Sequence, residues 1–187
     1  VRKMITVKIN GEERQYPQGA TYEDVTNDYQ QEYENLIALA ARDGKIRELF
    51  KKLTRDCEVT FFTLKDDVGN KTYVRSATML FLKAVFDVYG REAAQSCRVE
   101  FAIGNGSYIS PKEKINATEE NAAKIRNRMR ELVEAKTPFL KRSYSLDNAM
   151  ELFRKEGMKD KEKLFRYRRG SFVNIYEMDG YYDYYYG

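Results

Sequence analysis

The chain has 187 residues, with 33 Lys and Arg against 29 Asp and Glu, 15 Tyr, 10 Phe, 2 Cys and neither His nor Trp. This length suffices for one large or two small domains with their own cores. The lack of histidine excludes His-dependent triads and the commonest zinc ligand, so any enzyme here must use carboxylates, Lys, Tyr or Cys. Cys57 and Cys97 form no CxxC motif. We expect two buried thiols, no metal site, no membrane span and a cytoplasmic protein.

The first third of the chain predicts a small unit of strands around one helix. Alternating apolar residues, an Asn-Gly hairpin motif and a Thr N-cap followed by acidic residues mark its elements. The expected order is strand 4–9, turn 10–11, strand 12–16, helix 21–34, strand 36–41, turn 43–44 and strand 58–64. The helix is expected to bury Tyr22, Val25 and Tyr29. The polar stretch Lys65–Asn70 contains a Gly, and we expect a domain boundary there.

The rest of the chain predicts a second unit built around an apolar helix. Residues Ser76 to Tyr89 leave little polar face, so we expect this helix to be buried and to end at Gly90. The other expected elements are strand 99–103, turn 104–106, strand 108–109, helix 118–135, strand 139–144, helix 145–157, helix 161–165, strand 172–176 and strand 181–186. The apolar stripe predicted for the long helix consists of Ala122, Ile125, Met129, Leu132 and Val133.

Positive charge gathers in residues 112–170, which hold 17 Lys and Arg against 10 Asp and Glu. Four cations lie on two neighbouring ridges of the predicted helix 118–135, namely Lys124, Arg126, Arg128 and Arg130. Because acidic residues share the helix, the favoured interpretation is a solvated face or a docking surface for a further domain. The alternative is a phosphate-reading RNA surface, with Lys141, Arg142, Arg166, Arg168 and Arg169 nearby in sequence.

Six tyrosines crowd the end of the chain, from Tyr176 onward. Strand alternation predicts one face with Tyr182, Tyr184 and Tyr186 and an opposite face with Tyr181 and Tyr185. One set is expected to pack inside while the other presents hydroxyl groups. This arrangement suits a core with a contact surface, and base stacking is the alternative.

Two stretches carry a family resemblance. Residues 5–25, ITVKINGEERQYPQGATYEDV, resemble the TGS domain, a ubiquitin-like β-grasp module that opens bacterial threonyl-tRNA synthetases. The segment from Tyr73-Val-Arg-Ser-Ala-Thr-Met to Phe172-Val-Asn-Ile-Tyr resembles their second domain, of the threonyl/alanyl-tRNA synthetase editing type. In that domain mischarged seryl-tRNA is hydrolysed. The resemblance implies an α+β chain with a TGS domain over residues 1–65 and an editing-like domain over residues 70–187.

The editing domain of that family carries an HxxxH pair on its central helix and a CxxxH pair on a late strand and turn. Alignment of the flanking residues places Arg75 and Met79 at the first pair, and Tyr176 and Gly180 at the second. A guanidinium, a thioether, a phenol and a hydrogen atom cannot replace three imidazoles and a thiol as bases or ligands. The resemblance therefore implies a degenerate editing site without catalytic residues. Asp179, Cys97 or a Tyr remain as possible substitutes for the lost groups.

Arg75 is the most informative of these positions. A fixed cation in the old editing pocket is expected to attract a carboxylate or phosphate, which makes the pocket a ligand sensor. Alternatively, Arg75 pairs with a nearby acid such as Glu177 or Asp179.

A TGS domain followed by an editing domain without histidines is similar to the N-terminal region of bacterial uridine kinase-like nucleoside kinases. This implies a non-catalytic accessory or regulatory region whose partner is a C-terminal P-loop kinase domain. The chain contains no G-x-x-x-x-G-K-[ST] motif, so ATP and Mg²⁺ are expected only in that further domain. The ligand of this region is expected to be a tRNA, a nucleotide or an amino acid. The alternatives are a tRNA-editing hydrolase and a stand-alone RNA-binding module.

Overall fold

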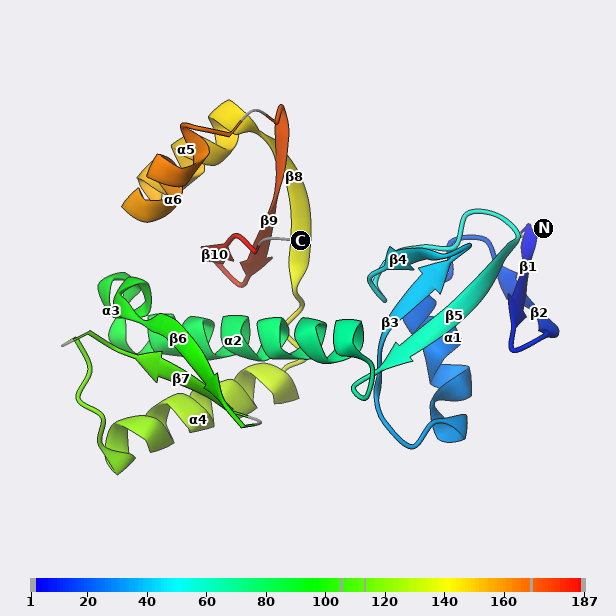
Figure 1. Ribbon diagram of the computed structural model, residues 1–187, viewed down its shortest axis with the longest axis horizontal. Helices are drawn as coiled ribbons and strands as arrows, with labels where there is room; N and C mark the ends of the chain where they lie inside the picture. Colours follow the sequence, from blue (N-terminus) through cyan, green and yellow to red (C-terminus); the bar gives the residue numbers. More distant parts are fainter. Residues whose placement is uncertain (1–2, 105, 113, 169, 186–187) are drawn as a thin grey trace. The chain divides into compact units, whose positions relative to one another are not determined.

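The computed structural model describes residues 3–104, 106–112, 114–168 and 170–185. The chain divides into two compact units, Val1–Ser76 and Ala77–Gly187, called here the first and the second unit. Helix α2 (Asp67–Tyr89) contains the point of division (Figure 1). Both units combine helices with mixed or antiparallel sheets, in keeping with the expected α+β class. No helix in these residues is long and apolar enough to cross a membrane.

The first unit is a five-stranded mixed sheet with one α-helix. Its strands have the order β2-β1-β5-β3-β4, and β1 and β5 run parallel while the other neighbours are antiparallel. The elements are β1 (Met4–Ile9), β2 (Glu12–Pro17), α1 (Tyr22–Tyr29), β3 (Ile37–Arg42), β4 (Lys45–Arg47) and β5 (Cys57–Thr63). Strand β4 was not predicted, whereas the other four strands lie within about one residue of their expected positions.

Local chemistry explains where α1 begins and ends. Thr21 and Asp24 form a capping box, in which the Asp24 N–H donates to the Thr21 hydroxyl at 3.1 Å. The predicted extension to Glu34 is wrong, because α1 stops at Tyr29. The Gln30 side chain accepts from the Ile37 N–H at 2.9 Å, and so joins the helix end to the start of β3. A 3₁₀ turn, Gln30–Glu32, fills the gap.

The helix α1 supplies one side of the core of the first unit, and Figure 1 shows it across one face of the sheet. Tyr22, Val25 and Tyr29 are all buried, as their helical spacing predicted. They pack against inward-facing strand residues, which include Ile5, Val7, Ile9, Ile37, Ala40, Val59 and Phe61.

The polar stretch Lys65–Asn70 leads into α2, which begins at Asp67. The Asp66 carboxylate accepts from the Thr63 N–H at 2.7 Å, and helical bonding starts with the Asn70 N–H donating to the Asp66 carbonyl. The helix therefore begins nine residues before the predicted Ser76. Gly69 serves close packing here, since a Cβ on it would lie 2.0 Å from the Thr63 carbonyl oxygen.

The second unit combines helices with a three-stranded sheet and a separate two-stranded ribbon. The sheet has the order β10-β9-β8, and β6 pairs with β7. Its elements after α2 are α3 (Arg91–Ser96), β6 (Arg98–Ile103), β7 (Gly106–Ser110), α4 (Glu119–Glu134), β8 (Leu140–Ser145), α5 (Leu146–Lys155), α6 (Lys159–Phe165), β9 (Phe172–Met178) and β10 (Tyr181–Asp183). Helix α3 was not predicted. Asn105, in the predicted turn 104–106, lies outside the described residues.

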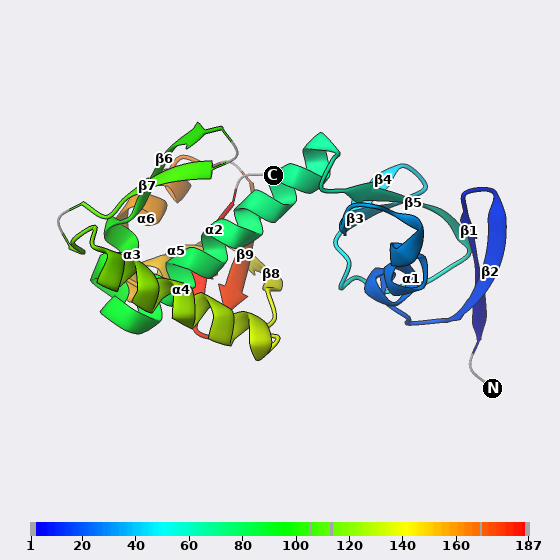
Figure 2. The same ribbon diagram turned by 90° about the horizontal axis from the view of Figure 1, so that it is seen from below.

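Helix α4 lies beside α2, as Figures 1 and 2 both show. The Tyr89 hydroxyl donates to the Asn121 side chain at 2.7 Å and holds the two helices together. Within the predicted apolar stripe, Ile125 and Leu132 are buried, but Ala122 is exposed and Val133 is 60% exposed. The stripe is thus narrower than predicted, because only the residues that face the core are covered.

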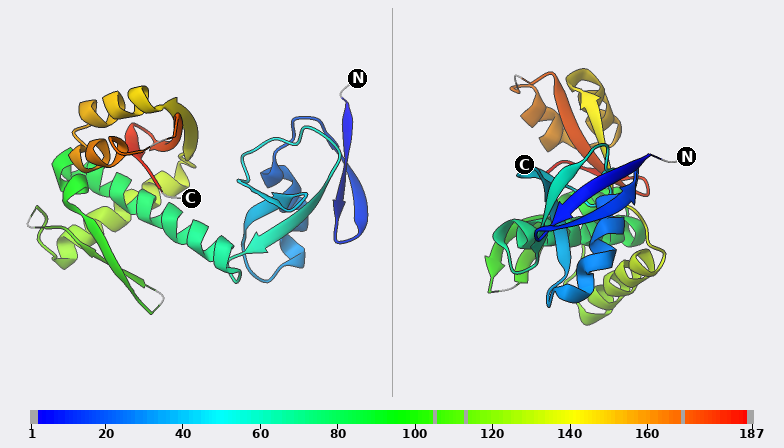
Figure 3. Two further views of the ribbon diagram at one scale, coloured as in Figure 1. Left: turned by 45° about the horizontal axis from the view of Figure 1, so that its top comes forward. Right: turned by 90° about the vertical axis from the view of Figure 1, so that its right-hand side faces the viewer.

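Strand β9 contributes to two separate cores. Val173 and Ile175 pack with buried residues of α5 and α6, which lie against the sheet in Figure 3. Met178, at the other end of β9, packs instead with residues of α2 and α4.

The predicted strand 181–186 is too long, because β10 ends at Asp183. The Asp183 carboxylate accepts from the Tyr184 N–H at 2.7 Å and turns the backbone out of the ladder. The predicted grouping of the tyrosines is nevertheless confirmed, because Tyr182 and Tyr184 pack in the core of α5 and α6 whereas Tyr181 and Tyr185 pack in the core of α2. The expectation that only one set packs inside is wrong, since Tyr181 and Tyr184 are both buried. Tyr186 lies outside the described residues.

Candidate functional site

Met79 and Tyr176, two of the four positions aligned with the editing signature, meet in one hydrophobic cluster. Met79 is 1% exposed and packs in the α2 core with Met178 and Tyr181. Tyr176 lies partly buried against this core, and its ring meets that of Tyr185 edge to face with the centroids 5.8 Å apart. The place of two polar side chains is thus taken by close apolar and aromatic packing.

Gly180, the third position, belongs to the two-residue turn that joins β9 to β10. Asp179 and Gly180 have φ values of 44° and 80°, and Met178 pairs with Tyr181 across the turn. An Asp-Gly pair with two positive φ values is typical of a type I′ hairpin. Gly180 therefore sets the backbone of the turn and offers no functional group.

Arg75, the fourth position, is exposed and precedes Met79 by one turn of α2. It falls in the first unit, whereas the other three positions lie in the second. The two acids considered as its partners are engaged within the second unit. Glu177 lies 3.9 Å from Arg142, and the Asp179 carboxylate lies 3.4 Å from Lys83.

A buried lysine fixes the hairpin turn to α2, and the sequence analysis did not find it. The Lys83 ammonium donates to the Asp179 carbonyl at 2.6 Å and to the Asp87 carboxylate at 2.7 Å. Arg128 of α4 donates to the other oxygen of Asp87 at 2.9 Å. A lysine inside an apolar helical stretch, four residues before an aspartate, was the available sequence signal.

Asp183 is the most deeply buried acid of the second unit. Lys161 lies 3.5 Å from its carboxylate, and the Tyr181 hydroxyl donates to it at 3.4 Å. Burial raises the pKa of Asp183, and the positive charge of Lys161 opposes this shift. Burial and the nearby Asp183 charge also raise the phenol pKa values of Tyr181 and Tyr185. The sequence signal for this site was one acid within the run of terminal tyrosines.

Cys97 and Asp179, the expected substitutes for the missing editing residues, have different surroundings. Burial raises the pKa of the Cys97 thiol, which keeps it protonated and weakly nucleophilic at neutral pH. Asp179 is tied to Lys83 by its carboxylate and its carbonyl.

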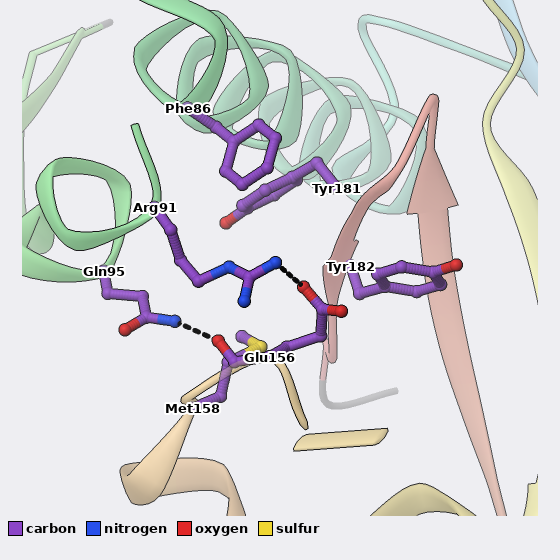
Figure 4. A pocket seen from close by; sticks show the side chains of 7 residues that line it. All are labelled: Phe86, Arg91, Gln95, Glu156, Met158, Tyr181 and Tyr182. Atoms are coloured by element: carbon purple, nitrogen blue, oxygen red, sulfur yellow. Dashed lines mark hydrogen bonds and ion pairs between the residues drawn. The ribbon is translucent and has the colours of Figure 1, made fainter. Parts of the chain in front are cut away.

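Figure 4 shows the pocket next to Tyr181, which the chain fills with its own ion pair. The Arg91 guanidinium lies 2.7 Å from the Glu156 carboxylate, and the Gln95 amide donates to the Glu156 carbonyl at 2.7 Å. The remaining lining residues are Phe86, Met158, Tyr181 and Tyr182. These contacts clamp the end of α5 to α3.

Three of the four cations predicted for RNA binding on α4 are neutralised by the chain itself. Lys124 pairs with Glu120 at 2.7 Å, and Arg126 pairs with Glu119 at 2.9 Å. Arg128 pairs with Asp87 and with Glu131, at 2.9 and 2.8 Å. Arg130 is exposed and makes no ion pair within the part of the chain that the structure describes. The same residues contain no group of three His, Cys, Asp or Glu side chains suited to a metal ion.

Comparison with known proteins links the chain to one class of enzyme. No protein-family model matches it. It is 27% identical over 184 residues to the threonine–tRNA ligase of Thermotoga maritima, an alignment that covers 91% of this chain and 28% of the ligase. The enzyme of Carboxydothermus hydrogenoformans is 25% identical, with 92% and 28% covered, and that of Syntrophotalea carbinolica is 31% identical, with 74% and 23% covered.

The chain thus spans less than a third of the length of the curated relatives that it matches. The alignments with the Thermotoga and Carboxydothermus enzymes each cover about nine tenths of the chain, and therefore include residues of both units. This homology identifies a threonyl-tRNA synthetase-like region.

Proposed function

We propose that this region binds the aminoacylated end of a tRNA without hydrolysing the ester. Homology to threonine–tRNA ligases supports tRNA as the ligand class. The proposed lack of hydrolysis is supported by one observation. Met79 is buried in the cluster against which Tyr176 packs, and neither side chain is a base or metal ligand of the editing type. The region then recognises the aminoacylated end of the tRNA and leaves its ester bond intact.

The first unit also supports this proposal, because we infer that it is a TGS-like β-grasp domain. Its sheet order β2-β1-β5-β3-β4, its parallel central pair and its single helix α1 suit a ubiquitin-like fold. We infer that the accessory region belongs to a uridine kinase-like protein, on the resemblance of the degenerate editing positions alone. A P-loop motif encoded after Gly187 is the expected finding, and class II synthetase motifs there contradict this parent.

The test of the proposed function is a deacylation and binding assay on the intact chain. Seryl- and threonyl-tRNA are incubated with the protein, and ester loss and complex formation are measured together. We expect a salt-sensitive complex and ester loss at the rate of the protein-free control. Ester loss above the control refutes the proposal. Failure to bind either tRNA refutes it as well.

The second candidate function is hydrolysis of mischarged tRNA, which the homology to threonine–tRNA ligases favours. The buried Asp183 beside Tyr181 is the only group described here that combines an acid with a raised pKa and neighbouring phenols. If the chain deacylates seryl-tRNA, Asp183→Asn is expected to abolish that activity. Asp160, an exposed acid on α6, provides the control. If Asp160→Asn loses the activity to the same extent, Asp183 has no specific role.

A further inference from the structure

Two arginines on neighbouring strands of the first unit lie on the same face of its sheet. Arg42 ends β3, and Arg47 ends β4, the strand at the edge of the sheet. Arg47 pairs with Ala40, which lies two residues before Arg42 and so shares its face. The two side chains are therefore diagonal neighbours across the antiparallel strands, within reach of one ligand. We infer that this arginine pair binds a phosphate group.

The face that carries the arginine pair is the one covered by helix α1. Ala40 belongs to the core of the first unit, and so does Tyr22 in the first turn of α1. Tyr22 is fully buried, and its hydroxyl has no hydrogen-bond acceptor within the residues described. Burial raises the pKa of this phenol, and the positive charges of Arg42 and Arg47 oppose the shift, so both act on the hydroxyl. A phosphate oxygen held by the arginine pair supplies the acceptor that this phenol lacks.

Neither guanidinium of the pair is neutralised within the part of the chain that the structure describes. Arg42 donates to the Thr54 hydroxyl at 3.2 Å, and Arg47 donates to the carbonyl of Ile46 at 2.9 Å. Both of these acceptors are uncharged. Because each guanidinium carries five N–H donors, further donors remain for an anion. The pair differs in this respect from the cations of α4, which are mostly engaged with carboxylates.

The charge around the arginine pair also favours an anionic ligand. The stretch 42–55 holds six Lys and Arg against two acidic residues. Its first acid, Asp43, is engaged with Arg55 at 3.1 Å and accepts from the Glu58 N–H at 3.0 Å. Two guanidinium groups beside a phenol match the charge and the several oxygens of a phosphate better than a flat carboxylate.

A phosphate group is carried both by an RNA backbone and by small phosphorylated molecules, and the inference names the chemistry that they share. It goes beyond the proposed tRNA binding and does not depend on it. The arginine pair lies in the first unit, whereas Met79 and Tyr176 of the candidate site lie in the second.

The test is an NMR titration of the intact chain with inorganic phosphate, followed through the side-chain Nε–H signals of its arginines. We expect the signals of Arg42 and Arg47 to shift and saturate together with phosphate, but not with sodium chloride at the same ionic strength. Arg42→Gln and Arg47→Gln are each expected to weaken phosphate binding about tenfold, because each removes one charge-assisted contact. Lys8→Gln is the matched control and is expected to change little, because Lys8 is exposed on the opposite face of the sheet.

Tyr22→Phe separates a built phosphate site from a general attraction by positive charge. The change removes one hydroxyl and leaves the net charge as it is. It is expected to weaken phosphate binding about tenfold, because a hydrogen bond to a charged group is lost. Unchanged phosphate affinity in this variant overturns the inferred site.

The same titration with AMP and with a short unstructured RNA identifies the source of the phosphate. Saturating shifts of Arg42 and Arg47 with the RNA support a nucleic-acid backbone, and shifts with AMP alone support a small phosphorylated molecule. Failure of all three ligands to move the two signals overturns the inference, as do equal effects of Lys8→Gln and the two arginine variants. These outcomes hold whether or not the chain binds charged tRNA, so failure of the proposed function remains distinguishable.

Discussion

The ammonium of Lys83 lies 2.7 Å from the carboxylate of Asp87, one turn further along α2, although only 3% of the Lys83 side chain is exposed. The same ammonium reaches the Asp179 carbonyl in the turn that contains Gly180. One lysine thus joins the central helix to the turn between β9 and β10. The relationship is structural, because the ammonium contacts the Asp87 carboxylate and both the carbonyl and the carboxylate of Asp179.

Loss of Lys83 is expected to be costly. Lys83→Ala leaves Asp87 and the Asp179 carbonyl without their buried partner, and such a change costs about 3–5 kcal/mol of unfolding free energy. Urea unfolding followed by circular dichroism measures it. The matched control is Lys71→Ala, whose pair with Asp67 lies in solvent and is worth below about 1 kcal/mol. Equal effects of the two changes contradict the proposed network.

Met79 and Arg75 lie on one face of α2, but their replacement by Ala is expected to change the unfolding free energy by very different amounts. Met79→Ala opens a cavity in the core of the second unit and should cost about 2–5 kcal/mol. Arg75→Ala removes an exposed side chain and should stay within about 0.5 kcal/mol. Denaturant midpoints of the two variants give the comparison. A larger loss for Arg75→Ala indicates that the guanidinium has a structural partner.

Two glycines are expected to resist substitution for different reasons. Gly180→Ala keeps open space around its new Cβ but places a side chain at φ 80°, which costs about 1–2 kcal/mol. Gly69→Ala forces Cβ onto the Thr63 carbonyl oxygen, so the start of α2 has to move, at about 1–3 kcal/mol. Gly180→Asn is the control, because Asn tolerates positive φ. If Gly180→Asn is as destabilising as Gly180→Ala, backbone strain is not the cause.

Asp183 is expected to make stability depend on pH. Its pKa is raised above 3.8 by burial, so above pH 3.8 the unfolded chain loses this proton before the folded chain does. Stability therefore falls as the pH rises through this window. Asp183→Asn has no carboxyl group to titrate here, so its unfolding free energy relative to the parent should increase as the pH rises above 3.8. Urea unfolding at several pH values tests this. A relative stability that is constant or falls with pH shows that the Lys161 pair outweighs burial.

Elements with a strong local signal could be predicted from the sequence. The Asn10-Gly11 hairpin, the Thr21 cap and the spacing of Tyr22, Val25 and Tyr29 all depend on neighbours within a few residues. Errors arose where distant groups decide the structure. The end of α1 depends on a Gln30 bond to the start of β3, and the early start of α2 depends on the close approach of Gly69 to Thr63.

The contacts of the candidate residues could not be predicted from the sequence. Alignment selected Met79 and Tyr176, and the fold brings both to one cluster. Lys83 and Asp183 escaped notice because their importance comes from burial beside partners such as Asp179 and Lys161, which tertiary packing alone decides. The cations of α4 looked available in sequence. Of their ion pairs, the one between Arg128 and Asp87 joins α4 to another helix, and local spacing does not reveal it.

The hairpin of β9 and β10 makes the two cores of the second unit interdependent. Val173 and Ile175 belong to one core, while Met178 and Tyr181 of the same hairpin belong to the other. Melting of either core releases a strand that the other requires. The backbone amides of β9 should consequently exchange with solvent only in the rarest openings, together with those of α2 and α5, so that this unit unfolds as one cooperative block.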